Sequence, residues 1–180
     1  FVNINRQDFG LKGNYICKAE FVQPMLHQLG NLAGNIFDIT KGEGAVNQVS
    51  KLVELLKERA NKKVLVYIRY HKTRLWVEDY LKRNHVAFQS IHGKVTKAKE
   101  RKQILDNFNS GKITVLLTSL TTSLDIDADT VIMYEFTTYV KQMIGRAHRG
   151  LSPKDLEILF LLTRDTEEIK YFLKYIYYRS

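Results

Sequence analysis

Cysteine and long apolar runs are scarce in this sequence. Cys17 is the only cysteine among 180 residues, so no disulfide can form within the chain, and nothing indicates an oxidising compartment. No window approaches the roughly 18 consecutive apolar residues of a membrane-spanning helix, and the N-terminus lacks the basic-then-apolar pattern of a signal peptide. We therefore expect an intracellular protein, cytoplasmic or nuclear if its source is eukaryotic, with no membrane partner.

The loop by which many nucleotide hydrolases cradle a triphosphate is also missing. Such a loop is rich in glycine and ends in Gly-Lys-Ser/Thr, and an acidic strand end holds magnesium nearby. The nearest strings, GLKGN from Gly10 and KGEG from Lys41, have neither the spacing nor the ending. The chain alone therefore cannot bind and cleave a nucleoside triphosphate by this chemistry.

Motifs for metals and nucleophiles are absent as well. Asp125, Asp127 and Asp129 resemble the opening of a calcium loop, but the sixth position is Thr130 and the twelfth is Phe136, where glycine and glutamate are required. The histidines and the cysteine do not have the spacing of a zinc site, and no Gly-x-Ser-x-Gly elbow occurs. We predict no metal site and no nucleophilic catalysis.

Positive charge is in excess. The chain has 28 Lys and Arg against 19 Asp and Glu, a net charge of +9, and 44% of its residues are hydrophobic. A chain of this length and composition can bury roughly 70% of its unfolded surface around one core. The charge favours an anionic partner, and nucleic acid or nucleotide phosphate is commoner than a membrane.

Short apolar runs alternate with amphipathic segments. Apolar runs of this length are typical of strands buried on both faces of a sheet, and apolar residues at i, i+3, i+4 and i+7 are typical of helices. The predicted strands are residues 64–68, 87–91, 114–118, 130–134 and 156–162. Four helices are predicted: one that ends near residue 61, one that contains residues 75–81, one over residues 97–110 and one that begins at residue 165. The alternation predicts an α/β fold with a parallel sheet and helices on both faces.

Polar residues follow the predicted strands at their carboxyl ends, where ligands bind in sheets of this kind. These segments are residues 69–73, 92–94, 119–125 and 135–138, and the string QMIGRAHRG follows at residues 142–150. On a helix Gln142, Arg146 and Arg149 would share one face, at i, i+4 and i+7. A Gln/Arg face taken alone is more often a solvated surface than a site, so the surrounding segments must decide.

Four segments in order resemble the second RecA-like lobe of superfamily-two helicases and translocases. They are VLVYIRYHKT, FQSIHGKVTKAKERKQILDNFNSG, VLLTSLTTSLDIDADTVIMYE and QMIGRAHRG, within residues 47–173. The last segment, followed by TRDTEEIKYFLKYI, is most similar to the Swi/Snf-like branch of double-stranded DNA translocases. The resemblance implies a three-layer RecA-like fold.

In that family two arginines reach across a cleft to a triphosphate held mainly by the first lobe. The resemblance therefore implies that Arg146 and Arg149 are catalytic arginine fingers, which stabilise charge at the γ-phosphate of ATP. It also implies that Gln142, Gly145 and Asp125 lie at the ATP, and that the first lobe, outside this chain, binds ATP with Mg²⁺ and is the partner of this lobe.

The same resemblance implies contacts with a nucleic-acid backbone. Contacts of this kind give affinity and tracking without reading sequence. The candidates are Arg69, His71, Lys72, His92, Gly93, Lys94, Thr118 and Ser119. The sequence departs from the family pattern at Ser123, where glycine is usual, and at Glu135, where the Swi/Snf-like branch often has aspartate.

The N-terminal part precedes residues 47–173, and its segment QPMLHQLGNLAGN also suits the Swi/Snf-like branch. Residues 1–22 show no clean period and are interpreted as a poorly specified leader. From residue 23 helical spacing behind Pro24 predicts a helix that stops near Gly34, and residues 40–44 are interpreted as a linker. We divide the chain into residues 1–45, an inter-lobe or accessory segment, and residues 46–180, the RecA-like lobe. The first residue is Phe1 rather than Met, which fits a piece of a longer protein.

These patterns predict the C-terminal lobe of an ATP-dependent translocase or helicase that acts on double-stranded DNA. Alone, the fragment is expected to be inactive as an ATPase. Two alternatives remain open: a non-catalytic module that binds nucleic acid or protein with the same fold, and the same lobe of an RNA helicase.

Overall fold

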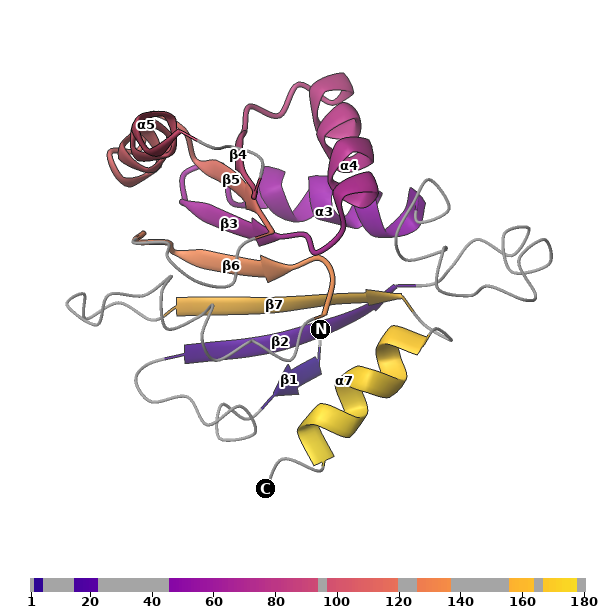
Figure 1. The fold of residues 1–180 in the computed structure, drawn as a ribbon. Coiled ribbons are helices and arrows are strands. Elements are labelled where there is room, and N and C mark those ends of the chain that lie inside the picture. Colours follow the sequence, from indigo (N-terminus) through magenta and orange to yellow (C-terminus); the bar gives the residue numbers. More distant parts are fainter. Residues whose placement is uncertain are drawn as a thin grey trace.

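The fold is built on one seven-stranded sheet. The computed structural model describes residues 2–4, 15–22, 46–93, 97–119, 126–136, 156–163 and 167–177. The strand order is β1-β2-β7-β6-β3-β5-β4, and all neighbours are parallel except β1, which is antiparallel to β2 (Figure 1). The strands are β1 (Val2–Ile4), β2 (Tyr15–Val22), β3 (Val64–Tyr67), β4 (Gln89–Ile91), β5 (Val115–Thr118), β6 (Thr130–Met133) and β7 (Leu156–Thr163).

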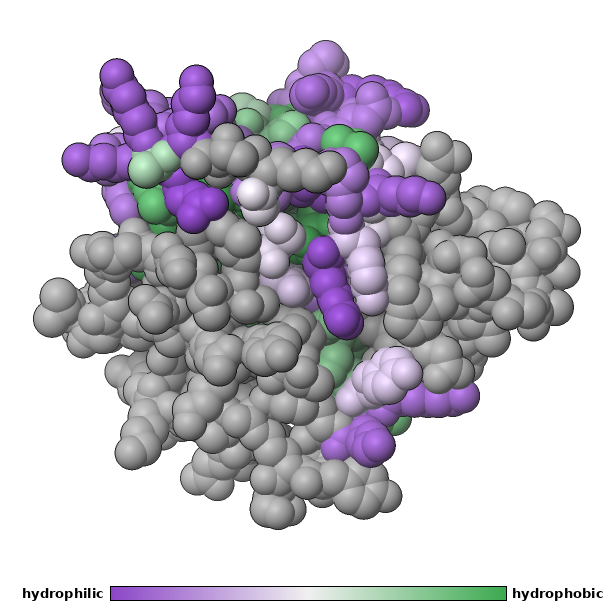
Figure 2. Space-filling view, viewed as in Figure 1, coloured by the Kyte–Doolittle hydropathy of each residue, from purple (hydrophilic) through white to green (hydrophobic). Residues whose placement is uncertain are grey.

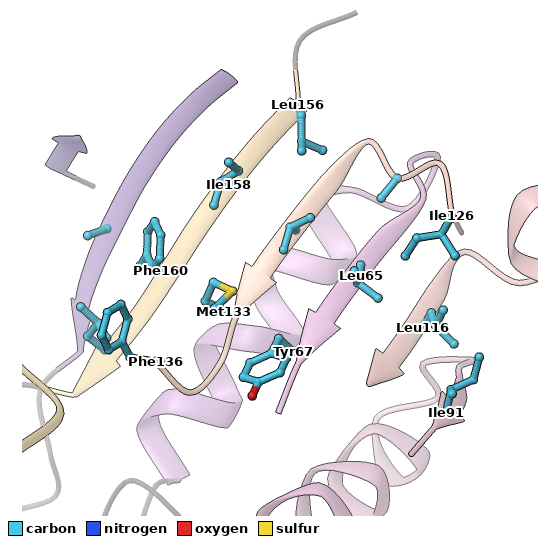
Figure 3. Close-up of a cluster of buried hydrophobic side chains, with 14 of the residues drawn as sticks. Leu65, Tyr67, Ile91, Leu116, Ile126, Met133, Phe136, Leu156, Ile158 and Phe160 are labelled. Atoms are coloured by element: carbon cyan, nitrogen blue, oxygen red, sulfur yellow. The ribbon is translucent and has the colours of Figure 1, made fainter. Parts of the chain in front are cut away.

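Helices cover both faces of this sheet. They are α3 (Val46–Glu58), α4 (His71–Arg83), α5 (Ala98–Asn109) and α7 (Glu167–Tyr177). Helices α3 and α4 pack on the face to which Leu159 and Leu161 of β7 point, whereas α5 and α7 pack on the face that carries Ile158 and Phe160. This second face is drawn in Figure 3. The alternation of side chains along β7 therefore supplies both cores, which is why the strand is apolar at every one of these positions.

The chain path explains why α4 and α5 lie on opposite faces. From β3 the chain passes through α4 to β4, beyond β5, and then returns through α5 to β5. Crossovers between parallel strands are right-handed, so a connection that moves one way across a sheet and a connection that moves back lie on opposite sides. The α/β fold with a parallel sheet and helices on both faces is thus confirmed.

The predicted strands and the helices from residue 46 onward are confirmed within a few residues at their ends. The sequence predicted no strand within residues 1–22, but β1 and β2 lie there. Strand β2 pairs with β7 over its whole length, from Tyr15 with Leu156 to Val22 with Thr163. The predicted helix and linker between residues 23 and 44 lie outside the described residues, and the domain division at residue 45 stays a prediction.

A pair of charged side chains joins the segment after α3 to the start of β7, on the side of the sheet where the strands begin. Arg59, just after α3, donates from Nε to Oε1 of Glu157 at 2.6 Å and from NH2 to Oε2 at 3.1 Å, and the Thr130 hydroxyl donates to Oε1 at 3.1 Å. Burial alone would raise the pKa of the Glu157 carboxyl, but the hydrogen bonds and charge of Arg59, with smaller effects of Thr130 and Lys18, lower it below its ordinary value.

Glu157→Gln should lower the free energy of unfolding by about 1–3 kcal/mol at neutral pH. Because the folded-state pKa of Glu157 is lowered, its stabilisation is fully present above the unfolded-state pKa and is lost as pH falls through the folded-state pKa. Denaturant unfolding of both proteins across acidic and neutral pH checks this: the difference should shrink with acidification. Glu54→Gln, at a side chain 57% exposed on α3, is the control. A difference that is constant with pH would contradict the role given to the charge.

Candidate nucleic-acid interface

The chain reverses its direction across the sheet between β3 and β6. After β3 it builds β4 and β5 on one side, and it then crosses to β6 on the other side. The carboxyl ends of β3 and β6 are neighbours, because Tyr67 pairs with Met133 and the Tyr134 amide donates to the Tyr67 carbonyl at 3.0 Å. In open α/β sheets the ligand site lies outside the carboxyl ends at such a reversal.

Glu135 connects the two strand ends at this point. Its Oε1 accepts a hydrogen bond of 3.0 Å from the backbone amide of Tyr70, and its side chain is almost completely buried. A buried carboxylate that bonds a backbone amide fixes that peptide in place. Glu135 therefore holds the turn between β3 and α4, and sequence analysis noted this residue only as a departure from a family pattern.

The turn held by Glu135 presents basic side chains. Arg69, His71 and Lys72 are exposed, and the first turn of α4 has no acidic residue. The Arg69 Cζ lies 5.1 Å from the centre of the Tyr70 ring, a cation–π geometry that restrains the guanidinium. These three predicted nucleic-acid contacts are therefore brought together at the edge where the rule for α/β sheets expects a ligand.

Two histidines meet beside this turn. His92 directly follows β4 and is half-buried, and its ring centre lies 6.3 Å from that of His71, at an angle of 64°. Behind them Arg74 donates to the Nδ1 atom of His71 at 2.6 Å and to Oε1 of Glu78 at 2.7 Å. His71 is exposed, but its imidazole is thus anchored to the buried guanidinium of Arg74.

The remaining predicted contacts differ in their surroundings. Gly93 is exposed, and a Cβ built there would meet nothing within 4 Å. Ser119 is half-buried after β5, while Thr118 is fully buried and its carbonyl accepts from the Ile68 amide at 2.9 Å. The Thr118 side chain thus does not face solvent, and its contact with nucleic acid stays a prediction. Outside the described residues lie Lys94, Asp125, Gln142, Gly145, Arg146 and Arg149.

Sequence analysis did not find Gln48, which shapes the same edge of the sheet from α3. Its side chain is buried, and Nε2 donates to the carbonyl of Tyr134 at 2.5 Å and to that of Leu161 at 3.1 Å. No local signal marks a glutamine for this role, because its two partners lie 86 and 113 residues away.

Hydrophilic side chains gather over α5 and over α4 on the face shown in Figure 2. On α5 and just before it Lys97, Lys99 and Lys102 are exposed.

Among the described residues no group of three His, Cys, Asp or Glu could hold a metal ion. Within the same ranges no helix has the length and apolar character needed to cross a membrane.

A family model described as the Helicase conserved C-terminal domain matches residues 47–150. Because it covers more than half of the chain, the chain belongs to this family. The match includes the β3–α4 turn, Glu135 and the string QMIGRAHRG.

Relatives and a solved structure agree with this assignment. The chain is 25% identical over 145 residues to a probable ATP-dependent RNA helicase, DDX4, of Sus scrofa, covering 77% of this chain and 19% of the relative. It is 26% identical over 168 residues to the CHD3-type chromatin-remodeling factor CHR7 of Arabidopsis thaliana, covering 88% of this chain and 14% of the relative. The SWI2/SNF2 ATPase C-terminal domain of Sulfolobus solfataricus has the same fold, with a TM-score of 0.65, 12% identity and coverage of 91% of this chain and 86% of that one.

The RecA-like fold of helicase C-terminal domains is thus confirmed, and the similarity to the chromatin-remodeling factor agrees with the branch indicated by the sequence. The chain spans less than a fifth of the length of the two curated relatives.

Proposed function

We propose that this chain is the second lobe of an ATP-dependent translocase that moves along double-stranded DNA. The observation that carries the proposal is the exposed basic turn of Arg69, His71 and Lys72, held by Glu135 at the point where the sheet reverses. Basic side chains on a rigid turn suit a repeated phosphate backbone, which is recognised without regard to sequence. The net charge of +9 supports an anionic partner of this kind.

The nucleotide half of the proposal concerns residues outside the described ranges. Arg146 and Arg149 would approach the γ-phosphate of an ATP bound by a first lobe, with Gln142, Gly145 and Asp125 close to the nucleotide. A guanidinium suits this role because it is permanently charged and can bond two phosphate oxygens at once. As the family resemblance implies, we assign the binding of Mg²⁺ to the first lobe, together with the triphosphate.

Lys72→Ala in the full-length protein should reduce the dependence of DNA affinity on salt. Each lost phosphate contact lowers the slope of log affinity against log salt concentration by about 0.9. Titration of a labelled duplex by the variant and the unmodified protein at several salt concentrations measures this slope. The matched control is Lys82→Ala, because Lys82 is exposed on the same helix but lies in its last turn. Equal slopes for Lys72→Ala and the unmodified protein would remove Lys72 from the interface.

The class of nucleic acid is tested by the rate of ATP hydrolysis. We expect duplex DNA to stimulate the full-length protein more than single-stranded DNA or RNA of the same length. RNA as the stronger stimulant would favour the alternative suggested by the RNA helicase relative. Binding of DNA without any hydrolysis would favour a non-catalytic module. This chain alone should hydrolyse ATP slowly or not at all, and turnover by it at the rate of the full-length protein would contradict the assignment of ATP binding to another lobe.

A further inference from the structure

A buried network connects α4 to β4 behind the basic turn. Arg74, with only 3% of its surface exposed, donates from NH1 to Oε1 of Glu78 at 2.7 Å and from NH2 to Nδ1 of His71 at 2.6 Å. Ser90 on β4 donates to the same Oε1 atom at 2.7 Å. Glu78 therefore fixes the Arg74 guanidinium from one side. The guanidinium, held in this way, restrains the ring of the exposed His71 through its second hydrogen bond.

The contact between Arg74 and His71 determines which ring nitrogen carries the proton. A guanidinium has donors and no acceptor, so the Nδ1 atom of His71 must accept the hydrogen bond through its lone pair. The ring that accepts at Nδ1 is neutral and carries its proton on Nε2. Nε2 lies on the other side of the ring, away from Arg74, and His71 is exposed. The site thus presents an uncharged N–H donor next to the charged Lys72.

We propose that Arg74 is a positioning residue that presets His71 as a neutral N–H donor to a phosphate oxygen of the DNA backbone. This inference rests on the proposed function, because it assumes that the β3–α4 turn faces the backbone. It assigns different work to adjacent residues. Lys72 supplies charge and displaces counterions, whereas His71 supplies a directed hydrogen bond that displaces none.

This division gives His71→Ala a distinct signature. A lost hydrogen bond to a charged phosphate should weaken duplex binding roughly tenfold. Because no counterion is involved, the loss should be the same at every salt concentration, so the plot of log affinity against log salt shifts in parallel. Lys72→Ala should instead change the slope of that plot. His71 is exposed, so its removal does not require a change in the core.

A double-mutant cycle tests whether Arg74 acts through His71. Arg74→Lys keeps the charge but loses the planar fork that bonds two partners at once. It should weaken DNA binding of the full-length protein several-fold on its own, and it should add nothing in the presence of His71→Ala. Arg83→Lys is the matched control, since Arg83 lies on the same helix and pairs with the exposed Asp79. Thermal unfolding of each variant shows whether Arg74→Lys is folded at the temperature of the binding measurement.

The outcomes separate this inference from the proposed function. If the unmodified protein shows no salt-dependent binding to the duplex, the proposed function fails. If it binds and Lys72→Ala changes the slope, but His71→Ala has no effect or changes the slope as well, only the inference about His71 is overturned. Additive effects of Arg74→Lys and His71→Ala would overturn the role of Arg74, because a merely structural arginine acts whether or not His71 is present.

Discussion

Arg146→Ala in the full-length protein should lower the rate of DNA-stimulated ATP hydrolysis by about a thousandfold or more, and Arg149→Ala should do the same. Both arginines are proposed to neutralise charge that develops on the γ-phosphate in the transition state. The loss should appear in kcat, because the interaction is stronger in the transition state than with bound ATP. Steady-state hydrolysis at saturating DNA and ATP measures it.

The control for the arginine fingers is a surface arginine of the described fold. Arg83→Ala removes an exposed guanidinium that pairs with Asp79 on the same helix, and should leave hydrolysis unchanged. Duplex binding without ATP should be retained in Arg146→Ala and Arg149→Ala, which separates a loss of chemistry from a loss of fold. Normal turnover in both finger variants would refute the role given to the string QMIGRAHRG.

Phe172→Ala should lower the free energy of unfolding by about 3–5 kcal/mol. Phe172 is only 1% exposed and fastens α7 to the sheet. Its ring centre lies 5.3 Å from that of Phe160 on β7, 5.4 Å from Phe136 and 6.4 Å from Phe21 on β2. Truncation removes a large side chain from a place where three neighbouring rings cannot all move inward, so a cavity remains. Denaturant unfolding of the chain measures the loss.

The adjacent residue provides a close control for Phe172. Tyr171 is on the same helix and is 55% exposed, so Tyr171→Ala should change stability by no more than about 0.5 kcal/mol. Both substitutions replace an aromatic residue by alanine in α7, and therefore the change in helix propensity is similar. A loss for Tyr171→Ala as large as that for Phe172→Ala would contradict the packing described for this face.

The central strands could be predicted from the sequence because their signal is local. Strands β3 and β5 are buried at every position, and a strand covered by helices on both faces must be apolar throughout. Strand β2 carries Lys18 and Glu20 among its apolar residues, and its partner β7 lies about 140 residues later in the chain. No local pattern contains that pairing, which is why β2 was missed.

The same distinction applies to the interface. Arg69, His71 and Lys72 could be proposed because they directly follow a predicted strand. The roles of Glu135 and Arg74 could not, since they depend on partners that the fold supplies: a backbone amide 65 residues away for Glu135, and a carboxylate anchored by Ser90 for Arg74. Polar residues that orient a site from behind have no sequence pattern of their own.

The two hydrogen bonds from Gln48 mark the point where strands β6 and β7 separate. Strands β6 and β7 pair as far as Met133 with Phe160, and the next two carbonyls, of Tyr134 and Leu161, both accept from the Gln48 amide instead. The Gln48 side chain of α3 thus bonds both strands where their mutual pairing ends. Beyond it β7 continues beside β2 to Thr163, whereas Tyr134 stays bonded to β3. At the carboxyl edge, β6 therefore ends beside β3 and β7 ends beside β2, with the Gln48 amide bonded to both strand ends.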